Sequence, residues 1–233
     1  MGTSKGYIPP KNAQWKQAKD SVTRMLGTSK GSEGTKKAIS KYAEAYMSTH
    51  LANSNITTVV GGVMNFLNSI NANGVDATVK SLGLDSLLNK SGNELYKGII
   101  DYFARDFATT DMQIIRDSLS ETFKHLEVDT FEDFEKIASD EFLIYFLIEF
   151  AVKNFETCFS EKILSKSDLA NDYDRIMEDV SNIIENKILT DIVLGEKLQL
   201  DYLSKEGQDY IMSVCRECFN TLRVMEDGYE NLG

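Results

Sequence analysis

The cysteines offer the most readable chemistry in this sequence. Cys215 and Cys218 form a CxxC pair, whose sulfur atoms would share one face of a helix. A closed zinc site needs two further ligands, and Cys158, His50 and His125 supply no second spaced pair. We therefore expect no metal and no other cofactor, and we expect all three cysteines to be reduced structural thiols.

Two further groups of titratable residues have types that could carry catalytic or metal chemistry. Glu121 and His125 lie four residues apart, without the Glu-x-x-His spacing of a di-iron bundle, and a surface pair beside Lys124 is the simpler interpretation. The acidic residues between 168 and 179 lack the central glycine of a calcium loop and fit the start of a helix. No nucleophile elbow, P-loop or dinucleotide fingerprint occurs. The sequence thus predicts that the protein is not a self-contained enzyme.

The amino terminus carries a different kind of chemistry. Removal of Met1 would leave Gly2 as the first residue. An α-amino group has a pKa of about 7.7–8.0 against about 10.4 for lysine, so roughly a tenth of it is neutral at pH 7. The amine of Gly2 would then be the most abundant neutral amine nucleophile of the chain. Gly6 stands where N-myristoylation prefers Ser or Thr, which argues against a lipid anchor.

The residues around this amine predict a tail followed by a helix. Residues 1–11 combine Gly, Ser, Thr and two prolines without apolar periodicity, which is typical of a flexible segment that a partner's cleft would order. From Asn12 onward, apolar residues recur at every three or four positions until Gly27. Residues 27–35 are predicted to form a loop, and within it the pentapeptide GTSKG repeats that of residues 2–6, a recurrence best explained by chance.

The rest of the sequence predicts an all-α protein, a multi-helix globular bundle with a flexible N-terminal tail. Neither period-two alternation nor clustered Val and Thr indicates a strand. The pair Gly61–Gly62 inside a helical pattern indicates close helix contact or a broken first turn. The ranges predicted to be helical are 12–26, 36–50, 59–70, 76–83, 92–107, 110–126, 130–137, 139–165, 168–194 and 205–227.

The most apolar segment should supply the centre of the core. Residues 142–150 place five large apolar side chains on one broad helical face, with Tyr145 and Glu149 toward its edge. These five residues are Phe142, Leu143, Phe146, Leu147 and Phe150. The run is nine residues long, whereas a membrane span needs roughly 20.

Charge is distributed unevenly along the chain. Residues 1–50 carry nine basic and three acidic side chains, a net charge of +6, which leaves −17 for the remainder of a chain whose total is −11. We therefore divide the chain into a flexible tail (1–11), a basic helical arm (12–50) and an acidic all-helical body (51–233). An acidic body repels nucleic acid and membranes, so only the arm could contact either. With three Cys and no leader-like start, a cytoplasmic protein without membrane contact is expected.

Several of these residues resemble the QatB family of the bacterial Qat anti-phage defence system. The resemblance rests on the opening MGTS, the Pro-containing polar tail, the Trp15 helix with Val22-Thr23-Arg24, and the later Val60-Gly61-Gly62. It implies three neighbours, namely an ATPase, a QueC-like enzyme and a TatD-like nuclease. It also implies that the QueC-like partner joins a 7-deazaguanine to the terminal glycine as an amide. Carried onto this sequence, the acceptor is Gly2, and the stretch recognised by the partner is Thr3, Ser4, Lys5 and Gly6.

Two other functions remain open from the sequence. One is a nucleic-acid-binding adaptor that uses the basic arm, with Tyr7, Trp15 and Tyr42 available to stack on bases and with steeply salt-dependent binding. The other is a purely structural helical scaffold, for which the tail would be dispensable. Deletion of residues 2–11 distinguishes two of these functions. A structural scaffold would tolerate the deletion, whereas a protein whose tail is presented to a modifying partner would not.

Overall fold

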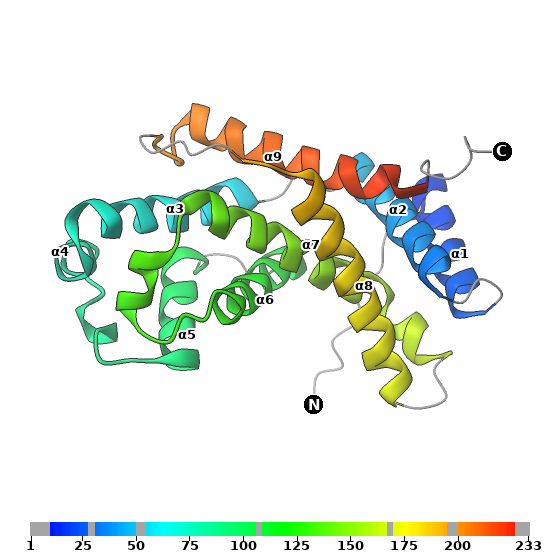
Figure 1. Cartoon of the computed structure of the whole chain (residues 1–233), viewed down its shortest axis with the longest axis horizontal. Coiled ribbons are helices and arrows are strands. Elements are labelled where there is room, and N and C mark those ends of the chain that lie inside the picture. The colour runs from blue at the N-terminus through cyan, green and yellow to red at the C-terminus, as the bar shows by residue number, and fades with distance from the viewer. Residues whose placement is uncertain are drawn as a thin grey trace. The chain divides into compact units, whose positions relative to one another are not determined.

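The computed structural model describes residues 10–27, 31–49, 55–105, 109–166, 170–194 and 200–226. Every regular element in these ranges is a helix and none is a strand, which confirms the all-α prediction (Figure 1). The α-helices are α1 (Ala13–Leu26), α2 (Ser32–Thr49), α3 (Ile56–Asn73), α4 (Val75–Ser81), α5 (Gly92–Phe103), α6 (Thr110–His125), α7 (Ser139–Leu164), α8 (Ala170–Asp191) and α9 (Lys205–Arg223). The short 3-10 helices are η2 (Asp85–Leu87), η3 (Phe131–Lys136) and η4 (Val224–Glu226).

The chain forms two compact units, each assembled from segments that are distant in sequence. Unit 1 comprises residues 1–53, 151–193 and 215–233, and unit 2 comprises residues 54–150 and 194–214. Unit 1 has sixteen basic and sixteen acidic residues, whereas unit 2 has nine basic and twenty acidic residues. Unit 2 therefore carries the whole formal net charge of −11. The division into tail, arm and body stays a prediction.

In unit 1, α1 and α2 pack along each other (Figure 1). The side chain of Asn12 caps α1 by accepting a 2.9 Å hydrogen bond from the backbone N–H of Trp15. The predicted loop over 27–35 is too long, because α2 already begins at Ser32. Gly31 adopts a φ of 101°, and its carbonyl accepts hydrogen bonds from both the backbone N–H and the hydroxyl of Thr35. Because Thr35 is buried, this polar stretch forms the first turn of the helix instead of a loop.

In unit 2, α3 runs without a break through its glycine pair. A Cβ atom on Gly61 would lie 2.6 Å from the carbonyl oxygen of Tyr202, which is closer than real Cβ atoms approach backbone. Of the two interpretations of the Gly61–Gly62 pair, close contact is therefore confirmed, and a broken first turn is wrong. The helix ends at Gly74, whose φ of 80° turns the chain into α4.

The predicted core of residues 142–150 is confirmed. All five predicted core side chains are at most 2% exposed, and Tyr145 and Glu149 are half-buried. Ile144 and Ile148 are buried as well, so this part of α7 is apolar on more than one side. Such a helix lies within the core instead of covering it.

The segment 130–137, predicted to be a helix, forms the 3-10 helix η3. Thr130 and Asp133 form a reciprocal capping box, in which the Asp133 carboxylate accepts a 2.9 Å hydrogen bond from the backbone N–H of Thr130. Ile137 is extended and ends the segment just before α7 begins. Among the helices of the described ranges, none combines the length and the hydropathy needed to cross a bilayer.

Candidate functional site

The residues predicted to be modified or recognised lie outside the described part of the chain. These residues are Gly2, Thr3, Ser4, Lys5 and Gly6. The structure describes the chain from Pro10 onward, which leads through Lys11 and Asn12 into α1. The candidate site is therefore characterised by the contacts that fix α1, because they set the point from which the preceding residues start.

Trp15 is the main anchor of α1. Its side chain is fully buried, and its indole Nε1–H donates a 3.0 Å hydrogen bond to the hydroxyl of Thr49 near the end of α2. The indole also contacts the rings of Tyr42 and Phe159, each with a centroid distance of 6.4 Å. A buried indole whose polar N–H finds a partner combines a large apolar contact with a fixed orientation. Contacts with α2 and α7 thus fix the position of the first turn of α1.

Tyr42 lies at the centre of this aromatic cluster. Its hydroxyl donates a 3.0 Å hydrogen bond to Oδ1 of Asn154, and both side chains are buried. Its ring meets that of Phe155 edge to face at 5.4 Å. Because both polar groups are satisfied inside the core, the pair orients α2 against α7 without leaving an unpaired buried atom.

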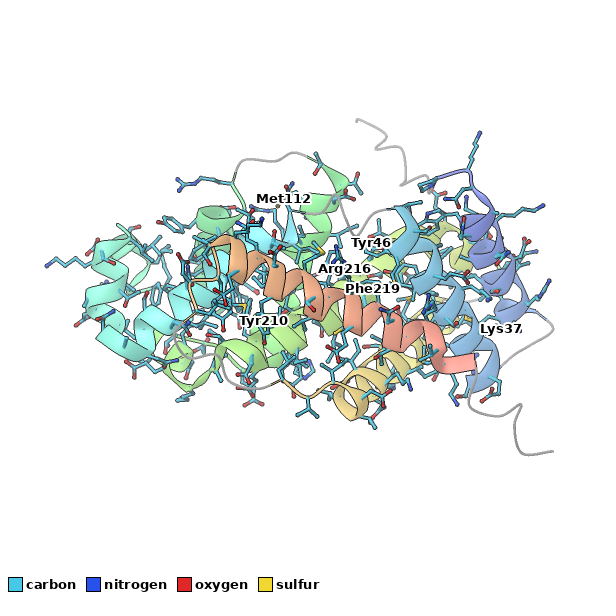
Figure 2. All side chains as sticks on the ribbon, turned by 90° about the horizontal axis from the view of Figure 1, so that it is seen from above. Lys37, Tyr46, Met112, Tyr210, Arg216 and Phe219 are labelled. Carbon is cyan, nitrogen blue, oxygen red and sulfur yellow. The ribbon has the colours of Figure 1, made fainter. Side chains whose placement is uncertain are left out.

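The C-terminal part of α9 packs against the same aromatic cluster, since the ring of Phe219 lies 6.2 Å from that of Tyr42. The rings of Tyr46 and Phe219 stack with a centroid distance of 4.7 Å (Figure 2). The hydroxyl of Ser40 donates a 2.6 Å hydrogen bond to the backbone carbonyl of Arg223. Unit 1 is therefore built from three segments of the chain, whose contacts hold α1 through α2 and α7.

The outward face of α1 carries the basic residues on which the nucleic-acid hypothesis depends. Lys16 and Arg24 are exposed, and Asp20 lies between them at a spacing of four residues on each side. On α2, Lys36 pairs with Glu33 at 3.0 Å and Lys41 pairs with Glu44 at 3.3 Å. Acidic neighbours thus accompany much of the positive charge of this segment.

The two cysteines of the CxxC pair lie on the part of α9 that belongs to unit 1, and both are buried, at most 1% exposed. Burial raises the pKa of Cys215 to about 12, and burial followed by the neighbouring Cys215 raises the pKa of Cys218 further. The thiolate is the form that binds metal or attacks an electrophile, and at neutral pH it is scarcely populated here. Across the described ranges, no three His, Cys, Asp or Glu side chains gather as a metal site would require.

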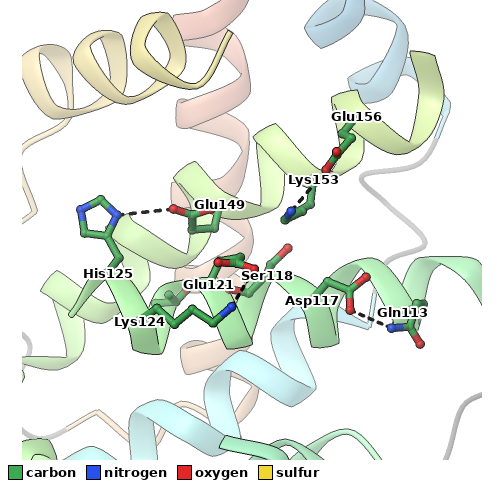
Figure 3. A network of polar contacts seen from close by, with 10 residues as sticks. Gln113, Asp117, Ser118, Glu121, Lys124, His125, Glu149, Lys153 and Glu156 are labelled. Carbon is green, nitrogen blue, oxygen red and sulfur yellow. Dashed lines mark hydrogen bonds and ion pairs between the residues drawn. The ribbon is translucent and has the colours of Figure 1, made fainter. Parts of the chain in front are cut away.

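The structure pairs the acid–base candidates of unit 2 differently from the sequence prediction. Glu121 bonds to Lys124 at 3.1 Å, whereas Nδ1 of His125 lies 3.4 Å from Oε1 of Glu149 on α7 (Figure 3). The imidazole ring also lies over Tyr145, with a centroid distance of 4.4 Å. The packing of α6 on α7 thus gives His125 a partner from a distant segment, and Glu121 lies in a surface pair with Lys124. The Glu121–Lys124 contact is a surface ion pair of modest energy.

Comparison with known proteins identifies the family of the chain through one family model. No curated protein and no solved structure matches the chain. The family model for "Qat anti-phage system associated protein QatB" matches residues 45–222. This range includes the last turn of α2, all of α3 to α8 with Gly61–Gly62, and α9 up to its penultimate residue. Since this range is well over half of the chain, the protein belongs to the QatB family of Qat anti-phage system components.

Proposed function

We propose that this chain is a non-enzymatic component of the Qat system whose N-terminal glycine is presented to a QueC-like partner and modified by it. The acceptor would be Gly2, and the group added would be a 7-deazaguanine joined through an amide. Membership of the QatB family is the observation that carries this proposal, together with the glycine that follows Met1. An ATPase and a TatD-like nuclease would complete the set of partners.

The proposed chemistry is acyl transfer to an amine. The neutral α-amine of Gly2 attacks an activated carboxyl carbon held by the partner, a C–N bond forms, and the activating group departs with its electron pair. The amine nitrogen then loses one proton to give a neutral amide. Lys5 is the wrong nucleophile for this step, because a lysine amine is almost wholly protonated at neutral pH.

The anchor of α1 supports the proposal in physical terms. Trp15 and Thr49 fix the first turn of the helix, so the residues before Pro10 start from a defined point on unit 1. A partner's active site then needs to recognise a short segment on a rigid base. Preorganisation of this kind lowers the entropy that binding must offset.

The test compares N-terminal and C-terminal extensions in cells that carry the complete system. Residues added before Gly2 that cannot be removed should abolish protection against phage, since no free glycine amine remains. The same residues added after Gly233 are the matched control and should leave protection intact, as should Lys5→Arg. Circular dichroism and thermal unfolding should be the same for all variants. Full protection by the N-terminally blocked protein would overturn the proposal and favour the structural scaffold.

A further inference from the structure

Unit 2 contains a half-open pocket of about 410 Å³ that the proposed function does not use. It lies between one face of α3 and the C-terminal end of α5, with Leu82 and Leu203 contributing to its rim. A volume in this range is typical of small-molecule sites, which combine apolar walls with a few placed polar groups.

One wall of the pocket is a stripe of neutral polar side chains on α3. Asn55, Thr58 and Ser69 line it, at spacings that keep them on one face of the helix. Asn65 lies in the same stripe, but its amide is already hydrogen-bonded. Its Oδ1 accepts a hydrogen bond from the backbone N–H of Tyr202, and its Nδ2 donates one to the Asp201 carboxylate. Within the described ranges, the side chains of the other three make no hydrogen bond to protein, so their donors and acceptors are available to a ligand.

The opposite wall is aromatic. The rings of Tyr102 and Phe103 meet edge to face at 4.9 Å, and both residues line the pocket. Gly62 makes room for this wall, because a Cβ atom there would lie 2.8 Å from the Phe103 ring. The buried ring of Phe66 packs against the ring of Phe103, with a centroid distance of 5.8 Å. Because the two ring planes are almost perpendicular (86°), a planar ligand could stack on the face of one ring and meet the edge of the other.

Arg105 supplies the one positive charge among the residues that line the pocket. Its guanidinium lies 5.0 Å from the centroid of the Tyr102 ring, and the residue is exposed. It forms no ion pair with any residue of the described ranges, although unit 2 carries a net charge of −11. A guanidinium stacked on an aromatic ring is oriented to bind a phosphate or carboxylate through two parallel hydrogen bonds.

We propose that this pocket binds a nucleoside 5′-monophosphate. The three parts of the pocket match the three parts of such a ligand: the aromatic wall fits the base, the hydroxyl and amide stripe of α3 fits the ribose, and Arg105 fits the phosphate. A single phosphate is favoured over a triphosphate, because the acidic surroundings offer one cation and repel additional negative charge.

The central experiment measures binding of AMP, GMP, CMP and UMP to the full chain by isothermal titration calorimetry. At least one should bind with a Kd below about 1 mM, and Arg105→Gln should weaken it about tenfold, a change of about 1.4 kcal/mol. Lys97→Gln removes the same charge from an exposed position on α5 outside the pocket and should leave the Kd unchanged. The corresponding nucleoside, which lacks the phosphate, should bind the native and Arg105→Gln proteins equally.

A second pair of variants tests the α3 wall. Thr58→Val removes one hydroxyl from the pocket and should weaken binding of both nucleotide and nucleoside severalfold, whereas Thr57→Val, one residue earlier and outside the pocket, should not. Thermal unfolding of all variants checks that the fold is unchanged. The proposal is overturned if none of the four monophosphates binds, if Arg105→Gln binds as tightly as the native protein, or if the triphosphate binds more tightly than the monophosphate.

Discussion

The indole N–H of Trp15 donates a 3.0 Å hydrogen bond to the hydroxyl of Thr49, 34 residues later in the chain. This contact joins the first turn of α1 to the last turn of α2 inside a buried aromatic cluster. Trp15 is the only tryptophan, so its fluorescence reports on this anchor alone.

Removal of the Trp15 partner should weaken the anchor measurably. Thr49→Val removes the acceptor of the buried indole N–H, which should lower the free energy of unfolding by about 1–3 kcal/mol. Urea unfolding followed by Trp15 fluorescence measures this change. Thr23→Val is the matched control, since Thr23 is exposed on α1, and it should shift stability by no more than about 0.5 kcal/mol. Equal effects of the two variants would contradict the role assigned to the contact.

The neighbouring glycines of α3 should differ in their tolerance of alanine. Gly61→Ala places a methyl group 2.6 Å from the backbone oxygen of Tyr202, which cannot move without shifting the chain, and should cost about 1–3 kcal/mol. Gly62→Ala meets only the side chain of Phe103, which can rotate, so its cost should be smaller. Thermal unfolding of the two variants compares them directly. A greater loss for Gly62→Ala would show that the contact with Tyr202 is not the reason for Gly61.

The core of unit 2 should depend strongly on Phe146. This side chain is fully buried and stacks on Phe150 at 5.8 Å, so Phe146→Ala should cost about 3–5 kcal/mol. Leu88, in the same unit, is 37% exposed, and Leu88→Ala is expected to change stability by less than about 1 kcal/mol. Chemical denaturation followed by circular dichroism tests both. Similar losses for the two variants would be inconsistent with the burial described.

Acid should weaken the capping box of η3. Hydrogen bonds from Lys136, and then from the backbone N–H groups of Thr130 and Asp129, hold the pKa of the Asp133 carboxyl well below its usual range. Because the folded-state pKa is the lower one, this stabilisation is complete above the unfolded value of about 3.9 and is lost as the pH falls toward the folded value. Asp133→Asn should therefore cost about 0.5–1 kcal/mol at pH 7 and less at pH 2.5.

The matched control for this titration is Glu135→Gln, at an exposed position of the same 3-10 helix. Its stability should follow that of the native protein at both pH values. If the cost of Asp133→Asn is the same at pH 7 and pH 2.5, the carboxylate is not the group that stabilises η3.

Helix positions and the main core were predictable from the sequence, because apolar periodicity is a local signal. The run around Phe146 shows this, since its spacing alone identified the buried residues. The early start of α2 was not predictable, because Ser32 and Gly34 favour a loop unless the burial of Thr35 is known. Tertiary packing outweighs local propensity at such positions.

The contacts between distant segments could not be predicted from one sequence. Nothing in the local pattern pairs His125 with Glu149 or places Tyr202 against Gly61. The pocket residues were missed for the same reason, although the Tyr102-Phe103 pair followed by Arg105 at the end of a predicted helix was a readable signal. The predicted acceptor Gly2 and recognition residues lie outside the described ranges, so they stay predictions.

The central claim is tested most directly by the mass of the N-terminal peptide from protein produced together with its genomic neighbours. The proposal predicts that Met1 is removed and that fragmentation places one added 7-deazaguanine acyl group on the α-amine of Gly2. The added mass should disappear when the QueC-like neighbour is omitted or inactivated, and it should persist in Lys5→Arg. An unmodified N-terminal glycine, or a retained Met1, in cells that resist phage would contradict the account.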